Sequence, residues 1–110
     1  MTIKLVDVEK IRPLRSLVLR PGQPLDSTNY ERDNEKLTLH YANITNKEVL
    51  SIATFYPESM IEVKALNAYR LRGMATHPNY MRKGLARSLM LKAIQDIQNL
   101  GGDLIWCKAA

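Results

Sequence analysis

The sequence predicts one domain, residues 1–110, of the α/β (α+β) class, in which helices pack against a mixed sheet. Its length of 110 residues suits a single domain, and its 45% hydrophobic and 25% charged residues are typical of a globular chain. Strand-like segments are interspersed with segments of helical periodicity. Their order along the chain is β-α-(loop or α)-β-β-β-α-β, which predicts helices on a sheet.

The first third of the chain is predicted to form a strand, a helix and a polar loop. Ile3–Val6 is strand-like, and Asp7 is a good helix N-cap. The apolar residues after Asp7 recur at helical spacing up to Val18. Pro13 lies too deep for a first turn, so the helix either kinks there or begins later than Val8. Residues 25–36 are polar and without period, which predicts a surface loop or a loosely formed helix.

Three strands are predicted next, over Leu37–Asn43, Val49–Tyr56 and Ala68–Thr76. The polar residues 45–48 suit a hairpin turn between the first two. Gly73, inside the third strand, indicates a β-bulge or a close approach of another group to the backbone.

The strongest periodic signal is a helix from Lys83 to Leu100. Its apolar side chains share one wide face: Leu85, Ala86, Leu89, Met90, Ala93, Ile94 and Ile97. Gly101 and Gly102 stop the helix, and Asp103–Cys107 is predicted to be a buried final strand.

Charge and cysteine content narrow the classes of function. Sixteen Lys and Arg against eleven Asp and Glu leave a net charge of +5, which would attract nucleic acid, an acidic membrane surface or a phosphorylated small molecule. The single Cys107 excludes an internal disulfide and argues against a cysteine-built zinc site. No segment has the roughly twenty apolar residues of a membrane span. The charged N-terminus lacks the apolar core of a secretory signal, so we expect a cytoplasmic protein without metal or membrane partner.

The junction between the third strand and the long helix, residues 74–87 (MATHPNYMRKGLAR), has the composition of a pyrophosphate site. The N–H groups and the dipole of a helix's first turn attract anions. Gly84 permits close backbone approach, and Arg82, Lys83 and Arg87 add positive charge. The Walker and dinucleotide patterns are absent. The pattern by itself therefore leaves a plain basic strand–helix connection equally open.

Residues 71–89 resemble the acetyl-coenzyme-A motif of the GNAT superfamily of N-acetyltransferases. The positions that match in register are Pro78, Tyr80, Gly84, Leu85 and Ala86, followed by the apolar helix. Two departures stand out. Met81 occupies a position that is usually Gln or Arg, and the sequence ends at Ala110, where the family continues with a helix and two strands. The resemblance implies a mainly antiparallel GNAT-like sheet that lacks these last elements, and thus a C-terminally truncated domain.

The resemblance also implies acetyl-CoA as co-substrate. The third and final strands would splay apart, and the pantetheine arm would pair with the third strand. The implied cofactor-binding residues are Met74, Ala75, Thr76, Met81, Arg82, Lys83, Gly84, Leu85, Ala86 and Arg87. A primary amine of an unknown small-molecule or protein acceptor would attack the acetyl carbonyl directly, with catalysis by positioning and by a backbone N–H.

The general base is not identified by the resemblance, although one is needed because amines are mostly protonated at pH 7. The candidates are His40, Glu62 and His77. Each has a structural alternative, as a packed or hydrogen-bonded histidine or as a solvated loop glutamate.

Other conspicuous residues are expected to be structural. We expect Cys107 to be an inert core thiol. We expect Arg12, Arg15 and Arg20 to form a solvated helix face. An unpaired apolar edge at Leu104–Cys107 would favour a homodimer through that strand, or a longer protein.

Two other functions remain open at this point. One is an acetyl-CoA-binding module without turnover, consistent with Met81 and with the absence of the family's C-terminal tyrosine. The other is a small basic nucleic-acid-binding protein, for which 6% aromatic residues, not interleaved with basic ones, give little support.

Overall fold

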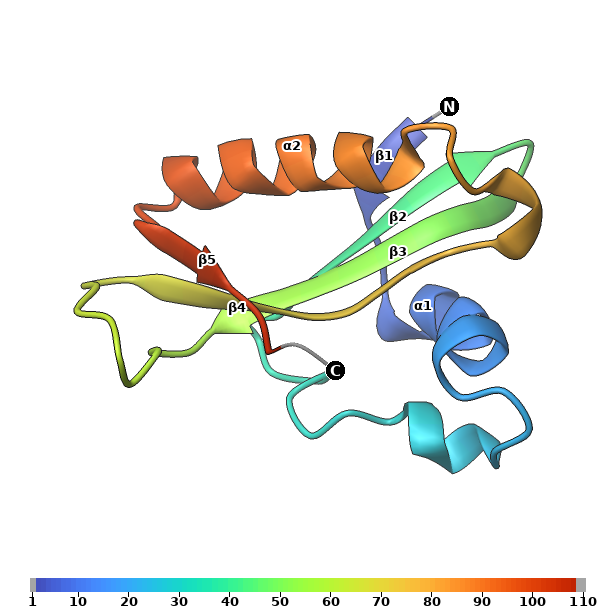
Figure 1. The fold of residues 1–110 in the computed structure, drawn as a ribbon, viewed down its shortest axis with the longest axis horizontal. Coiled ribbons are helices and arrows are strands. Elements are labelled where there is room, and N and C mark those ends of the chain that lie inside the picture. Colours follow the sequence, from blue (N-terminus) through green and yellow to red (C-terminus); the bar gives the residue numbers. More distant parts are fainter. Residues whose placement is uncertain (1, 109–110) are drawn as a thin grey trace.

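The computed structural model describes residues 2–108 and confirms a mixed sheet with a helix on each face (Figure 1). The strands and main helices are β1 Thr2–Leu5, α1 Val8–Leu14, β2 Leu39–Thr45, β3 Glu48–Pro57, β4 Ala68–Thr76, α2 Leu85–Asn99 and β5 Leu104–Trp106. A π-helical turn, η1, spans Arg15–Leu19, and 3-10 turns span Leu25–Thr28 (η2) and Pro78–Tyr80 (η3). The predicted order of elements is therefore confirmed.

The sheet has the spatial order β1-β2-β3-β4-β5, and only its last pair, β4 and β5, is parallel. The predicted hairpin joins β2 and β3. Its two turn residues, Asn46 and Lys47, have φ values of 51° and 66°, the left-handed pair that matches the twist of a two-residue hairpin.

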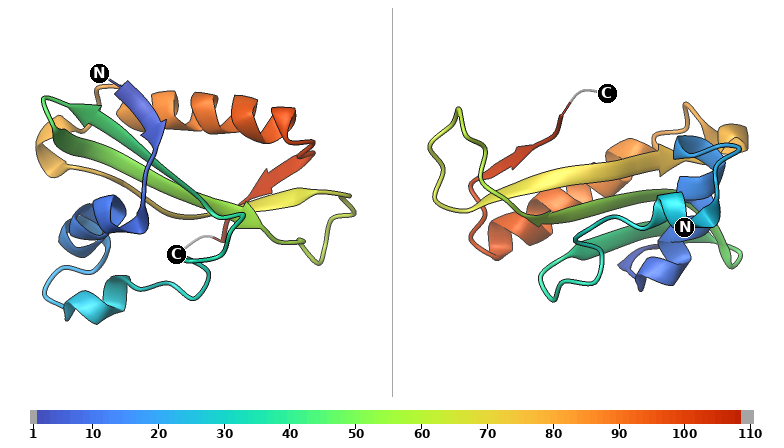
Figure 2. Two further views of the ribbon diagram at one scale, coloured as in Figure 1. Left: turned by 180° about the vertical axis from the view of Figure 1, so that it is seen from behind. Right: turned by 90° about the horizontal axis from the view of Figure 1, so that it is seen from below.

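Each face of the sheet buries its own apolar cluster, and Figure 2 shows the helices on opposite sides. One cluster packs α2 against the sheet through Tyr41, Ala53, Phe55, Tyr69, Leu89, Ala93 and Ile97. The other packs α1 through Ile11, Leu14, Ala42, Ile52 and Ala75. Neighbouring strand residues such as Ile52 and Ala53 face opposite clusters, as the period-two alternation of a strand requires. This layering fixes β4 between the two helices.

Helix α1 begins at Val8 and contains Pro13, so the alternative of a later start is wrong. Asp7 is the N-cap residue, but its side chain makes no capping hydrogen bond. The helix passes directly into η1, whose end is closed by the Arg20 N–H donating to the Arg15 carbonyl (3.0 Å). Proline removes one N–H donor and disturbs the regular ladder, and a widened turn next to it accommodates that disturbance.

Arg15 is fully buried, which corrects the expectation that it lies on a solvated face. Its guanidinium donates to both carboxylate oxygens of Asp33, at 2.6 and 2.9 Å. It also donates to the Thr28 carbonyl (2.9 Å) and to the Thr54 hydroxyl (3.0 Å). A bidentate, charge-assisted pair with further hydrogen bonds is what makes a buried guanidinium tolerable.

His40 extends this network on the next strand. Its Nε2 lies 2.9 Å from the Asp33 carbonyl, which only accepts, so Nε2 carries the proton. Its Nδ1 then accepts from the Thr54 hydroxyl at 2.9 Å. Burial lowers the pKa of His40 and outweighs the hydrogen bond to Asp33, which raises it. The ring is thus held neutral.

The C-terminal strand differs from its prediction. Strand β5 spans only three residues, which are half-buried, and it is an edge of the described sheet. Cys107 follows it and is exposed, so the expectation of a core thiol is wrong. Within residues 2–108 no helix is long and apolar enough to span a bilayer.

We predict that Asp33→Ala lowers the free energy of unfolding by about 3–5 kcal/mol, because it leaves the Arg15 charge buried without its partner. Urea unfolding followed by circular dichroism measures this. Glu35→Ala is the matched control, since it removes an exposed carboxylate that pairs with Arg32 two positions along the same loop. We expect that control to leave the unfolding midpoint nearly unchanged. Equal effects of the two variants would contradict the structural role of the buried pair.

We also predict that stability falls as the pH drops through 6.5, the ordinary pKa of a histidine. Because the pKa of His40 is lower in the folded state, the unfolded chain binds the proton first as the pH falls. The contribution of neutral His40 to the free energy of unfolding is therefore complete only above pH 6.5. For Asp33, burial would raise the carboxyl pKa, but hydrogen bonds from Arg15 and the Tyr30 N–H hold the pKa below its ordinary 3.8. Asp33 therefore does not titrate in the pH range in which His40 does. His40→Gln should flatten the pH dependence of the unfolding free energy between about pH 5 and 7. An unchanged slope in this variant would refute the assignment.

Candidate functional site

Strands β4 and β5 pair over only three residues, Ala68–Arg70 with Leu104–Trp106. Beyond this point they diverge, as the right-hand view of Figure 2 shows. We call this divergence the splay. Strand β4 continues to Thr76, so its edge on the β5 side has no strand neighbour within the described residues after Arg70. The splay expected from the resemblance is thus present.

A β-bulge interrupts β4 inside the splay. Ile52 pairs with Ala75 and Thr54 with Arg72, so two residues of β4, Gly73 and Met74, oppose one residue of β3. Gly73 has a φ of 78°, a left-handed value. A Cβ there would lie 3.0 Å from Cε2 of Tyr30 and 3.3 Å from Nε of Arg15. The expected bulge and the expected close approach therefore occur at the same glycine.

The loop after β4 is organised by His77. Its N–H donates to the Leu50 carbonyl (2.8 Å) and fastens the loop to β3. Its carbonyl accepts from the Tyr80 N–H (2.9 Å), and its Nδ1 accepts from the Asn79 N–H (3.1 Å). The His77 and Tyr80 rings also meet edge to face, with centroids 5.5 Å apart. These contacts define the path of the chain into α2.

Helix α2 begins after a turn with two left-handed residues, Arg82 (φ 63°) and its N-cap Gly84 (φ 77°). Within residues 2–108, the backbone N–H groups of the first turn of α2, residues 85–87, donate no hydrogen bond, and the Ser88 N–H is the first of the helix to find a carbonyl, that of Gly84 at 3.0 Å. The side chains of Arg82, Lys83 and Arg87 are exposed beside them. Free N–H groups, a helix N-terminus and three cations make this turn an anion-binding surface.

The ten predicted cofactor-binding residues thus form two groups joined by η3, Met74–Thr76 at the end of β4 and Met81–Arg87 at the start of α2. The side chains of Ala75 and Leu85 are buried in the core, so these residues offer only their backbone. Met81 is 59% exposed and offers no polar group from its side chain.

The three candidate bases are not brought together. His40 is buried, and both of its ring nitrogens are engaged, as described above. His77 lies in the loop after β4, and Glu62 is exposed in the connection between β3 and β4. No hydrogen bond within the described residues links any of them to another.

Sequence reasoning missed a cluster around Tyr30, on the α1 side of the splay. The guanidinium carbons of Arg15, Arg72 and Arg20 lie 3.9, 4.6 and 5.6 Å from the centre of the Tyr30 ring. The sequence contained one usable signal, because Arg15 follows Ile11 by four residues and so lies on the apolar stripe of α1.

Glu58 marks the start of the splay. Its carboxylate accepts from Arg70 (3.0 Å) and Arg32 (3.4 Å). Its backbone carbonyl accepts from the indole N–H of Trp106 (2.8 Å), which links β5 to the end of β3.

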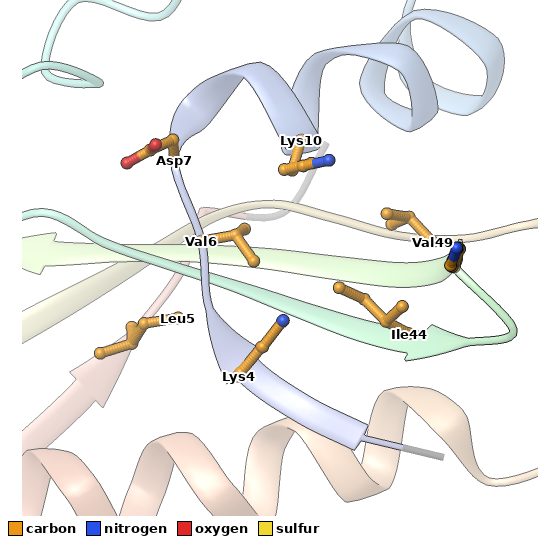
Figure 3. A pocket seen from close by; sticks show the side chains of 8 residues that line it. Lys4, Leu5, Val6, Asp7, Lys10, Ile44 and Val49 are labelled. Carbon is orange, nitrogen blue, oxygen red and sulfur yellow. The ribbon is translucent and has the colours of Figure 1, made fainter.

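A hollow of about 700 Å³ lies elsewhere, between β1, α1 and the β2–β3 hairpin (Figure 3). Val6, Ile44 and Val49 line it and belong to the periphery of the α1 core cluster, with Lys4, Lys10 and Lys47 around them. Strand β1 is at the opposite edge of the sheet from β5, so this hollow is separate from the splay.

Comparison with known proteins points to N-acetyltransferases. The model of the acetyltransferase (GNAT) family matches residues 8–110. An uncharacterized N-acetyltransferase of Bacillus subtilis, YitI, is 30% identical over 109 residues, which cover 99% of this chain and 73% of that protein.

Solved structures share the fold at lower identity. An aminoglycoside 6′-N-acetyltransferase from Acinetobacter haemolyticus superposes with a TM-score of 0.82 at 18% identity, over 100% of this chain and 80% of that one. A ribosomal-protein-alanine N-acetyltransferase from Brucella melitensis gives 0.78 at 16% identity, over 100% and 81%. The family model matches residues 8–110 and the Bacillus relative aligns with 99% of this chain, so the chain belongs to the GNAT family of N-acetyltransferases.

Proposed function

We propose that this protein transfers the acetyl group of acetyl-CoA to a primary amine by direct attack of the amine on the thioester. The observation that carries the proposal is the position of the splay next to the turn at residues 81–87, where the N–H groups of residues 85–87 have no acceptor within the described residues. Among the structural neighbours, one aminoglycoside N-acetyltransferase is a complex with CoA, and a predicted acetyltransferase from Clostridium acetobutylicum is a complex with acetyl-CoA. These complexes support the assignment of the co-substrate.

The pantetheine arm is assigned to the free edge of β4. Its amide groups would pair with the backbone of Met74 and Thr76 in the manner of an added strand. The pyrophosphate is assigned to the N–H groups of residues 81–87, with Arg82, Lys83 and Arg87 as counter-charges. Backbone groups carry most of this recognition, which is why Met81 is compatible with it.

Catalysis in this arrangement comes from positioning and from a backbone N–H of β4 that polarises the acetyl carbonyl. The amine must be neutral to attack, so one proton first leaves to a water chain or to a carboxylate. The C–N bond then forms and the C–S bond breaks, and CoA departs as a thiolate that takes up, through water, the second proton that the nitrogen loses. His40 is a poor base in the folded protein, because Thr54 and the Asp33 carbonyl engage both ring nitrogens. His77 and Glu62 stay as the candidate bases.

We predict that acetyl-CoA raises the melting temperature. At ~100 times its dissociation constant it should add about 2.7 kcal/mol of stability, or about 10 °C for a domain of this size. The control is adenosine 3′,5′-bisphosphate, which lacks the pantetheine arm and should give a much smaller shift. If acetyl-CoA causes no shift in a folded sample, the proposal is wrong. If both ligands raise the melting temperature equally, the assignment of the pantetheine arm to the splay is wrong.

We further predict that Gly84→Ala weakens acetyl-CoA binding about tenfold or more, equivalent to about 1.4 kcal/mol. A left-handed φ is costly for alanine, so the turn and its N–H groups must move. Isothermal calorimetry measures the dissociation constant. Gly22→Ala is the matched control, because Gly22 also has a left-handed φ (73°) and, like Gly84, has open space around its Cβ position. The proposal fails at this site if both variants bind acetyl-CoA as the wild type does.

Turnover separates transfer from binding alone. Mass spectrometry of an amine panel detects the acetylated product directly. This readout is preferable to thiol reagents, which would also react with the exposed Cys107. A protein that binds acetyl-CoA and acetylates nothing would be a binding module, and one whose affinity for nucleic acid falls steeply with salt and ignores acetyl-CoA would be a nucleic-acid-binding protein.

A further inference from the structure

The α1 side of the splay carries an uncompensated positive charge centred on Tyr30. Three guanidinium groups approach this ring, from Arg15, Arg20 and Arg72. Only Arg15 has a carboxylate partner, Asp33. Within residues 2–108, Arg20 and Arg72 have no carboxylate within 4.0 Å.

The hydrogen bonds of these two arginines are also incomplete. Arg20 donates only to the carbonyls of Ser27 and Leu19, both at 3.4 Å, and Arg72 donates to no group among the described residues. Both side chains are half-buried. A guanidinium has five N–H donors and keeps its charge, so each of these groups has donors and charge free for a ligand.

The surrounding carboxylates do not cancel this charge. Asp33 is engaged by Arg15, and Glu58 is shared between Arg32 and Arg70. Glu35 is exposed and pairs with Arg32. The remaining acidic residues of the loop, Asp26 and Glu31, are exposed to solvent. The face is therefore electropositive at Arg20 and Arg72.

This charge lies where the reacting end of the co-substrate is expected. Arg72 is two residues beyond Arg70, the last residue of β4 that pairs with β5, and it directly precedes the bulge at Gly73. If the pyrophosphate lies at residues 81–87, a pantetheine arm following β4 back toward β5 brings its acetyl group to this part of the strand. The inference thus rests on the proposed function.

We propose that the acceptor is an amine that also carries a carboxylate, which Arg72 and Arg20 bind beside Tyr30. Guanidinium groups match a carboxylate in charge and in hydrogen-bond geometry. The same charges repel polycationic amines. The protein is thus distinguished from the structural neighbours that are aminoglycoside acetyltransferases, although it shares their fold.

The test compares amines in matched acid and amide forms, for example dipeptides and their C-terminal amides, with neamine as a polycation. The amide form has an equal or larger fraction of neutral amine, so any bias from basicity works against the proposal. We expect kcat/KM to be about tenfold or more higher for the acid, equivalent to about 1.4 kcal/mol, and lowest for neamine. An aminophosphonate preferred tenfold over the matching carboxylate would overturn the assignment to a carboxylate.

Variants localise the effect. Arg72→Gln should reduce the acid-to-amide ratio to near one, and Arg20→Gln should reduce it in the same direction. Lys92→Gln is the control, because it removes one positive charge from α2 on the opposite face of the sheet and should retain the wild-type ratio. A ratio unchanged in both arginine variants would overturn the proposal.

Binding to the wild-type protein saturated with CoA provides a second readout that does not need turnover. Calorimetry should show tighter binding of the acid than of its amide. Equal binding of the two, or no binding of either, overturns the inference while leaving the acetyl-CoA melting shift intact. Loss of that shift would instead overturn the proposed function itself.

Discussion

The buried ion pair between Arg15 and Asp33 is the constraint on which the α1 side of this molecule depends. It ties the turn after α1 to the polar loop, and Thr54 and His40 connect the pair to β3 and β2. The Arg15 guanidinium also lies over Tyr30, whose ring fills the space beside Gly73. Burying two charges is tolerable only when each has its partners in place. The turn after α1, the polar loop and strands β2 and β3 are therefore expected to keep or lose this arrangement as one unit.

The region proposed to bind acetyl-CoA is built differently, from backbone rather than from side chains. The bulge at Gly73, the left-handed Gly84 and the free N–H groups at the start of α2 are features of chain geometry. Such features persist when side chains change, since an N–H group is present in every residue except proline. This explains how a fold superposable at a TM-score of 0.82 is maintained at 18% identity. It also explains why Met81, on the surface of the turn, does not disrupt the arrangement.

Local patterns predicted the parts of the fold that local chemistry determines. The apolar stripe located α2, the polar residues 45–48 located the hairpin, and Gly73 and Gly84 located the special backbone positions. The burial of Arg15 was not predictable in this way. The position of Arg15 on the apolar stripe of α1 favoured burial, whereas its charge opposed burial. The carboxylate that makes burial possible belongs to Asp33, eighteen residues further along the chain. Burial at the C-terminal strand was also misjudged for Cys107, because a short apolar segment does not reveal whether anything covers it.

The hydrogen bond from the Trp106 indole to the Glu58 carbonyl has an optical consequence. Trp106 is the single tryptophan of the sequence, and it lies at the last paired position of β5, opposite Arg70. Its half-buried ring has the Arg70 guanidinium 5.2 Å from its centre. Indole emission depends on the polarity and charge around the ring, so the tryptophan fluorescence of this protein originates at the point where β4 and β5 separate. The chain thus carries its own spectroscopic reporter of that junction, with no label attached.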